Sequence, residues 1–360
     1  MSLKSAIRTL LLITLVLFQS CKNTNKNDAS LFKTNKFELP IDKVFRTQKI
    51  SLESNVKSMI SFPYDLIRCN NRIIISSRAT EIKVFDMNGR YLYKIGRIGE
   101  GPGEYKSINC LFSITDNKIG IYDQSNSRIS IFDINGNYLM SKIVNIEDVY
   151  SLRRIINYRN NYYIHKPYTK KYPCNLMMLD SNFKIINNLL EASDNYAGYL
   201  YRGLFNGGIF LDTTSNSLYE INTYSDNIVR KLDLKTGHVT NINLGQPYFY
   251  KIVPPLKNLH DVSNTMKNYH LGTDIFNMFV LKNRYLFIQY LDFENNISKV
   301  KMVLYDLNTY NSYLLKGIIA PTYSDGNYLY ELRYSEKNNN KDNQVKNAII
   351  ILYNFNEGNL

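Results

Sequence analysis

The chain has 360 residues, of which 44% are hydrophobic, a fraction that is ordinary for a globular protein. This length allows two domains but does not exclude one, because single all-β domains can run long. The formal net charge of +13 favours anionic partners, and it bears on association rather than on the fold.

Residues 1–20 have the organisation of a secretory signal peptide. The basic residues Lys4 and Arg8 precede an apolar stretch, Leu10–Phe18, which is too short for a spanning helix of roughly 20 residues. The stretch ends in Ser20-Cys21, which resembles a bacterial lipobox. The resemblance implies cleavage before Cys21 and anchoring to a membrane through a lipid on that cysteine. The alternative is an ordinary signal peptide with an incidental cysteine.

The segment that follows the signal, residues 21–40, is polar and rich in Asn, Lys and Thr. This composition is typical of a flexible tether between an anchor and a folded body. Cys21 is not followed by Asp, and the lipoprotein resemblance then implies a place in the cell envelope at the outer membrane.

Three segments of similar sequence recur along the next part of the chain. They begin at Val84, Ile131 and Met178, and their aspartates Asp86, Asp133 and Asp180 recur every 47 residues; the first two continue as Asp-x-Asn-Gly. A period of about 40–50 residues built on strands is typical of propeller blades. The aspartate ends a strand and can cap the turn that follows, so we expect a structural role rather than a catalytic one.

Each repeat is predicted to contain four short strands, which in the first repeat are residues 62–69, 72–77, 81–86 and 91–96. Further repeats end their third strands near Asp233, Asp306 and Asn354, which gives six. The last repeat is too short for a fourth strand. We therefore expect Lys43–Leu52 to pair beside Ala348–Tyr353 and to close the ring, which protects the sheet edges.

The crossover Gly96–Tyr105 and the segments Lys118–Asp123 and Asn126–Asp133 resemble an NHL repeat. With the lipobox, the chain resembles bacterial six-bladed β-propeller lipoproteins of the TolB-like superfamily type. The resemblance implies an all-β, six-bladed propeller of four-stranded blades over residues 41–360, closed by an N-terminal strand. It implies little chemistry. No helix is predicted after the glycines of the crossover, although a phosphate-binding loop requires one. We therefore expect these glycines to let the chain pass from one blade to the next.

Three cysteines lie within the repeats, namely Cys69, Cys110 and Cys174. Export would permit a disulfide. Their odd number and their different offsets within the repeat favour buried free thiols instead.

One face of the predicted propeller carries the long loops. It comprises the loops between second and third strands and the crossovers between blades, and we call it the elaborated face. The long segments are Gly96–Tyr105, His165–Asn175, an insertion at about residues 245–275 that includes Tyr248, and Ser335–Lys346. The predicted ligand-binding residues are Arg97, Glu104, Tyr105, His165, Lys166, Tyr168, Lys170, Lys171, Tyr172, His260 and His270.

Lysines beside tyrosines on this face suit an anionic, ring-bearing ligand such as an acidic glycan. A merely solvated, Lys-rich surface is the alternative. The leading hypothesis is a lipid-anchored propeller that binds a ligand or protein partner without catalysis. A glycan hydrolase or lyase on the same face is the second hypothesis.

Other functions find less support in the sequence. His165, His260 and His270 could converge, but their spacing matches no usual zinc motif, so we expect no metal and no cofactor. No catalytic residue is assigned because no nucleophile motif is present. Nucleic acid would fit the charge, yet an exported protein rarely meets it. The oligomeric state stays open.

Overall fold

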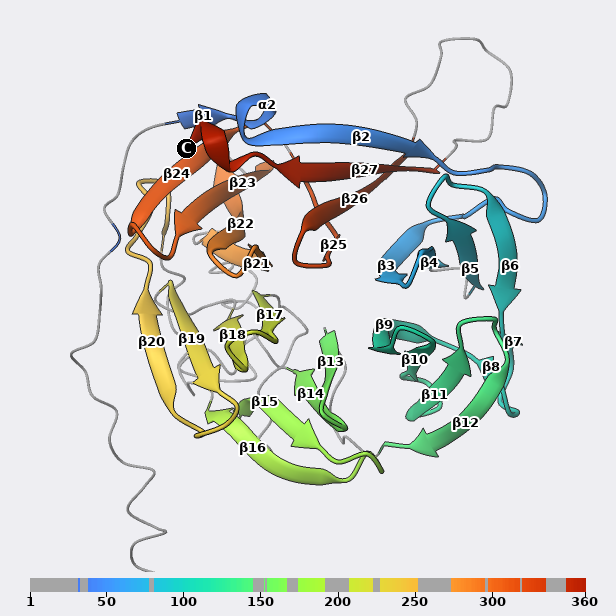
Figure 1. Cartoon of the computed structure of the whole chain (residues 1–360). Coiled ribbons are helices and arrows are strands. Elements are labelled where there is room, and N and C mark those ends of the chain that lie inside the picture. The colour runs from blue at the N-terminus through green and yellow to red at the C-terminus, as the bar shows by residue number, and fades with distance from the viewer. Residues whose placement is uncertain are drawn as a thin grey trace, which may run out of the picture.

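The computed structural model describes residues 32, 38–77, 81–144, 152, 154–166, 174–191, 207–222, 227–251, 273–294, 297–317, 319–334 and 348–360. These residues form six blade sheets arranged as a ring around a central axis, as Figure 1 shows. The protein is a six-bladed β-propeller, as the sequence predicts. Among the described residues, no helix has the length and apolar character needed to cross a bilayer.

Blades one to three each contain four antiparallel strands in chain order, with the first strand innermost and the fourth at the rim (Figure 1). Strands β4 and β5 have the predicted bounds, because short runs rich in Ile, Val and Phe and the flanking turns define them well. The strands are β3 (Pro63–Cys69), β4 (Arg72–Ser77), β5 (Glu81–Asp86) and β6 (Tyr91–Ile95) in blade one; β9 (Ile108–Thr115), β10 (Lys118–Asp123), β11 (Arg128–Asp133) and β12 (Tyr138–Ile143) in blade two; and β13 (Arg154–Tyr158), β14 (Asn161–His165), β15 (Cys174–Leu179) and β16 (Ile185–Glu191) in blade three.

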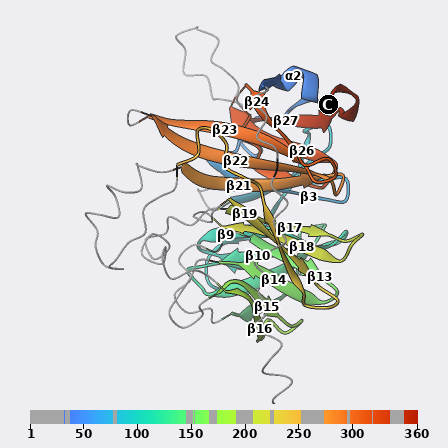
Figure 2. The same ribbon diagram turned by 90° about the vertical axis from the view of Figure 1, so that its left-hand side faces the viewer.

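Blades four to six follow the same order with two additions from the N-terminus. Blade five has the longest strands and projects past the other blades on one side of the ring (Figure 2). The strands are β17 (Gly207–Asp212), β18 (Ser217–Asn222), β19 (Ile228–Asp233) and β20 (Val239–Asn243) in blade four; β21 (Thr273–Leu281), β22 (Tyr285–Glu294), β23 (Ile297–Asp306) and β24 (Asn311–Lys316) in blade five; and β25 (Tyr323–Ser324), β26 (Tyr328–Tyr334) and β27 (Ala348–Phe355) in blade six.

The ring closes through strand β2 (Phe45–Ser51), which pairs antiparallel with β27 and supplies the fourth strand of blade six (Figure 1). The register runs from Phe45 opposite Phe355 to Ser51 opposite Ile349. The predicted closure is confirmed. Pairing the first strand of the chain with the last leaves no open seam in the ring, which is how propellers protect their edges.

A second N-terminal contact was not predicted. Strand β1 (Glu38–Pro40) pairs in parallel with β24 and adds a fifth strand to blade five, and the short helix α2 (Ile41–Val44) links it to β2. Upstream, Phe32 is only 3% exposed and meets the rings of Tyr305 and Tyr310 edge to face at 5.3 and 5.4 Å. The predicted tether over residues 21–40 is therefore corrected at Phe32 and at 38–40, because burial of an aromatic ring outweighs the polar composition around it.

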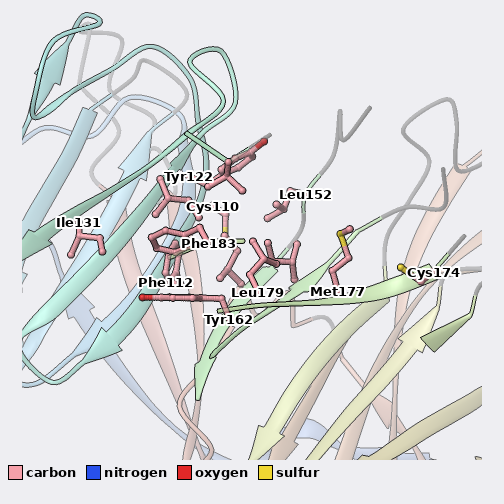
Figure 3. Close-up of a cluster of buried hydrophobic side chains, with 14 residues drawn as sticks. Cys110, Phe112, Tyr122, Ile131, Leu152, Tyr162, Cys174, Met177, Leu179 and Phe183 are labelled. Carbon is pink, nitrogen blue, oxygen red and sulfur yellow. The ribbon is translucent and has the colours of Figure 1, made fainter. Parts of the chain in front are cut away.

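The core consists of apolar clusters between neighbouring blades rather than one central nucleus. Figure 3 shows the cluster between blades two and three, where Phe112, Tyr162 and Phe183 converge. The rings of Tyr162 and Phe183 lie 4.4 Å apart, and those of Phe112 and Tyr162 lie 6.0 Å apart. Each blade thus depends on its neighbours for burial, and closure of the ring completes the core.

The cysteines within the repeats contribute to this apolar packing. Cys69, Cys110 and Cys174 are buried free thiols, as predicted, and Cys110 and Cys174 belong to the cluster in Figure 3. Burial raises the pKa of all three thiols. A buried thiol with a raised pKa is a poor nucleophile, so these cysteines serve packing.

The repeated aspartates cap turns, as predicted. One carboxylate oxygen of Asp86 accepts hydrogen bonds from the backbone N–H groups of Asn88 and Arg90, both at 2.9 Å. Asp133 and Asp180 make the same pair of bonds at positions two and four residues later. These bonds satisfy backbone donors in the turns between third and fourth strands, which explains the recurrence of the residue without any catalytic role.

Candidate functional site

A cavity of about 640 Å³ occupies the central channel, which is the space enclosed by the innermost strands of the ring (Figure 1). All six blades line it, and its walls carry carboxylates, amides, hydroxyls and a guanidinium beside apolar side chains. The polar side chains that face it include Asp65, Asp116, Arg154, Asn157, Thr213, Asn283 and Asp325. Concave sites of this size and mixed lining are typical of small-molecule pockets.

Arg154 crosses the channel from blade three to blade six. Its Nη2 donates a hydrogen bond to the carbonyl oxygen of Thr322 at 2.9 Å. Asp65 of blade one lies within electrostatic range of this guanidinium, and its carboxylate accepts backbone N–H bonds from Leu66 and Leu111 at 2.9 Å. Burial raises the pKa of Asp65, and the charge of Arg154 and these N–H bonds oppose that rise.

One end of the channel lies at the face of the ring that carries the turns between first and second strands. We call this face the turn face. Here Arg68 of blade one pairs with Asp325 of blade six at 2.8 Å, and the hydroxyl of Tyr330 donates to the same carboxylate at 2.7 Å. Lys282 extends away to Glu357 at 2.5 Å. Asp325 and Lys282 at this end are therefore held in ion pairs with neighbours, whereas Asp116 is exposed at the rim.

The predicted site residues of the first crossover form a compact structural unit. Strands β7 (Arg97–Ile98) and β8 (Glu104–Tyr105) pair in parallel, and the Glu104 carboxylate accepts from Arg97 at 2.6 Å and from the Gly101 N–H at 2.8 Å. A Cβ on Gly99 would collide with this carboxylate, so a larger residue there would displace Glu104 from these bonds. Tyr105 is fully buried, whereas the Arg97 side chain is 79% exposed.

The residues that resemble an NHL repeat hold this crossover against blade two. Arg128 donates hydrogen bonds to the carbonyl oxygens of Glu100 and Glu104 at 2.9 and 2.5 Å. Asp123 accepts from the backbone N–H groups of Lys106 and Ser107 at 2.9 and 3.0 Å. The motif thus serves the path of the chain between blades, as expected for the glycine-rich loop.

The predicted site residues His165 and Lys166 lie at the interface of blades three and four and have no exposed surface. His165 belongs to β14, and its Nε2 lies 3.6 Å from the carboxylate of Glu220 in blade four. Arg230 holds the other oxygen of that carboxylate at 2.7 Å. The ammonium group of Lys166 donates to the carbonyl of Cys174 at 2.9 Å. Both residues are buried rather than exposed on the elaborated face, because the β14–β15 ladder reaches His165 and the Lys166 N–H still bonds to the Asn175 carbonyl just beyond it.

Burial controls the ionisation of this interface. It lowers the pKa of His165, and it lowers the pKa of Lys166 to about 8. Burial alone would raise the pKa of Glu220, but the charge and hydrogen bond of Arg230, together with the nearby imidazole of His165, bring it down to about 2. Glu220 is therefore an ionised carboxylate between two blades at neutral pH.

The remaining predicted site residues lie outside the described part of the chain. They are Cys21, Tyr168, Lys170, Lys171, Tyr172, His260 and His270. Within the described ranges, no group of three or more His, Cys, Asp or Glu residues is placed to hold a metal ion.

The elaborated face of blade five carries an aromatic and cationic platform made of Tyr248, Phe249, Lys301 and Asp292. Tyr248 is 66% exposed, and its ring packs edge to face on the buried ring of Phe249 at 5.5 Å. The ammonium group of Lys301 lies 4.5 Å from the Phe249 ring and 6.0 Å from the Tyr248 ring. Asp292, which is buried, fixes that ammonium group at 2.6 Å.

Sequence reasoning included Tyr248 in the insertion but missed Lys301 and Asp292. Asp292 lies on β22 and Lys301 lies on β23. These two strands have ten residues each and form the projecting part of blade five in Figure 2. The available signal was the unusual length of this repeat, since Asp306 follows Asp233 by far more than one period. The side chains of that longer hairpin that contact the insertion are set by the register of β22 and β23, which the sequence alone does not reveal.

A family model for a domain of unknown function, DUF4934, matches residues 28–357. This chain belongs to the DUF4934 family. The match includes Phe32 and β1, so the N-terminal contacts with blade five fall inside the family domain.

Solved structures with the same fold resemble this DUF4934 chain over almost their whole length. A candidate exported protein of Bacteroides fragilis is 17% identical, with a TM-score of 0.69, covering 91% of this chain and 99% of that one. A member of the DUF4221 family from Bacteroides vulgatus is 12% identical, with a TM-score of 0.58, covering 90% and 99%. At these identities the likeness shows the fold alone. The sequence matches no curated protein.

Proposed function

We propose that this chain is a lipid-anchored, extracytoplasmic propeller that binds an acidic, ring-bearing glycan on its elaborated face, without catalysis. The observation that carries the proposal is the exposed ring of Tyr248, supported from below by Phe249 and flanked by Lys301. The predicted ligand-binding residues Tyr168, Lys170, Lys171 and Tyr172 lie outside the described part of the chain and stay part of this proposal.

The platform suits a sugar ring that carries a negative charge. A tyrosine that is exposed yet packed on a fixed neighbour offers a stacking surface with little loss of side-chain entropy on binding. The ammonium group of Lys301 lies beside that surface, but it is paired with Asp292 at 2.6 Å and its side chain is only 18% exposed, so it contributes more to holding the aromatic rings than to attracting an anion. The net charge of the chain, +13, would draw anionic ligands toward the protein.

The extracytoplasmic and lipid-anchored part of the proposal rests on the signal and lipobox pattern at residues 1–21. The similar fold of a Bacteroides fragilis protein described as a candidate exported protein is in keeping with it. Outer-membrane placement extends the lipobox resemblance and belongs to the same proposal.

Binding is favoured over the glycan hydrolase or lyase hypothesis by the structural roles of three carboxylates near the predicted sites. Glu104 and Asp123 hold the first crossover, and Asp325 is paired with Arg68. Carboxylates that are committed to such structural bonds are poor candidates for general acid and base roles, which need access to a substrate.

The binding proposal is tested with variants of Tyr248 in the full mature chain. On an array of acidic glycans followed by calorimetry with the best oligosaccharide, Tyr248→Ala should weaken binding about tenfold, which corresponds to roughly 1.4 kcal/mol. Tyr248→Phe should bind like the native chain because it keeps the ring. Lys301→Met should lower the affinity and should also reduce the dependence of the affinity on salt concentration. Lys118→Met, on the turn face, should change neither quantity. Binding that survives Tyr248→Ala unchanged, or an array with no acidic glycan bound, would contradict the proposal.

The lipid anchor is tested separately. Cys21→Ser should move the protein from the membrane fraction to the aqueous phase on detergent partitioning, because the acylated residue is lost. A second signal-region change, Ser2→Ala, leaves the lipobox intact and serves as the control. Retention of the Cys21→Ser protein in the membrane fraction would count against lipidation.

A further inference from the structure

We infer that the central channel is a second ligand site, which opens on the turn face and takes a neutral, polyhydroxylated ligand of mono- or disaccharide size. It differs from the platform of blade five in position and in charge. It rests on a cavity of about 640 Å³ and does not depend on the proposed acidic-glycan function. Small-molecule sites have volumes of roughly 300–1,000 Å³.

The position of the cavity along the axis follows from the residues that line it. Asp116, Thr213, Asn283 and Asn327 are exposed, and they lie in the turns between first and second strands of blades two, four, five and six. These turns form the rim on the turn face. Arg154 lies at the other end of its strand, where its bond to Thr322 joins opposite walls of the ring. The cavity is therefore entered from the turn face and crossed by a guanidinium deeper inside.

The charges around the cavity are paired except for the exposed carboxylate of Asp116 at the rim, for which no ion pair is seen among the described residues. Asp325 is bound by Arg68 at 2.8 Å, Lys282 is bound by Glu357 at 2.5 Å, and Arg154 faces Asp65. Unlike the chain as a whole, this lining has no excess of positive charge, since its acids are Asp65, Asp116 and Asp325 and its bases are Arg154 and Lys282. The channel consequently lacks the field that would select an anion.

Paired charges and amides still present hydrogen-bond donors and acceptors to a ligand. Arg154 supplies planar N–H donors, and Asn157 and Asn283 supply both kinds of group from blades three and five. The ring of Phe210 reaches across the rim, since a Cβ on Gly326 of blade six would lie 3.9 Å from its tip. Hydroxyl groups, which donate and accept together, match such a lining, and an apolar ring suits the C–H face of a sugar.

Calorimetry of the full mature chain with maltose, cellobiose and N,N′-diacetylchitobiose tests this inference. We expect at least one of these neutral probes to bind with an affinity that does not change between about 0.05 M and 0.5 M NaCl, because no ion pair is screened. Arg154→Met should weaken that binding about tenfold or more. Thr213→Trp should block the rim without removing a described hydrogen bond of that side chain.

His238→Trp places a similar ring on the turn face of blade four, away from the cavity, and should bind like the native chain. Tyr248→Ala should also leave neutral-sugar binding intact, which separates this site from the platform. If none of the three probes binds, or if Thr213→Trp and His238→Trp behave alike, the inference is wrong. Neutral-sugar binding that is lost with Tyr248→Ala would place these ligands on the elaborated face and overturn it as well.

Discussion

Glu220 shows how one residue can join two blades. Its carboxylate lies between His165 of blade three and Arg230 of its own blade, at 3.6 and 2.7 Å, and has no exposed surface. The sequence analysis placed His165 and Lys166 on the elaborated face because it assigned them to the long loop His165–Asn175. They are buried because the strands of blade three continue to that point, and a single sequence does not reveal where a ladder ends.

The ionisation of Glu220 predicts a pH dependence of folding stability. Its folded pKa of about 2 lies below the usual 4.5, so the stabilisation is fully present above about pH 4.5 and is lost as pH falls toward 2. Glu220→Gln should lower the free energy of unfolding at pH 7 by about 3 kcal/mol, since Arg230 and His165 lose their buried partner. In urea unfolding, the difference in the free energy of unfolding between the native chain and the variant should become smaller as the pH falls below 4.5. An equal difference at pH 7 and pH 3 would contradict this account.

The crossover from blade one to blade two shows what a motif can establish at the level of an element. Its glycines and the Asp123 and Arg128 positions were recognised from sequence, and the structure gives them bonds that hold the loop. The motif predicted the path of the chain well. Arg97 and Glu104 pair with each other at 2.6 Å, and this was not predicted because parallel pairing of two-residue strands has no sequence signature.

Arg128 should be the residue on which this element depends most. Arg128→Met removes two charge-assisted bonds to backbone carbonyls, so we expect a loss of about 2 kcal/mol in the free energy of unfolding. We also expect faster proteolytic cleavage within Gly99–Gly103 in the folded protein, because the loop is no longer held. Arg90→Met in an exposed turn is the control and should change neither quantity. Unchanged cleavage in Arg128→Met would show that the crossover is held by other contacts.

For the whole molecule, the regular period of the first repeats and the missing last strand were enough to predict the ring and its closure. The sites were harder to predict for a physical reason. The channel is lined by side chains from all six blades, so Arg154 and Thr322 meet although they lie 168 residues apart. The platform of blade five likewise needs the register of β22 and β23 to bring Lys301 to Phe249. The long loops indicated the elaborated face as the binding face, whereas the cavity opens on the turn face.

The contacts of the N-terminal segment have a mechanical consequence. A pull on the N-terminus would first load the buried ring of Phe32, then the parallel pairing of β1 with β24, and only then the closing strand β2. Three attachments in series mean that tension is borne by blade five before it reaches the seam of the ring. The closure on which every blade depends is thus shielded from force by a strand that takes no part in it.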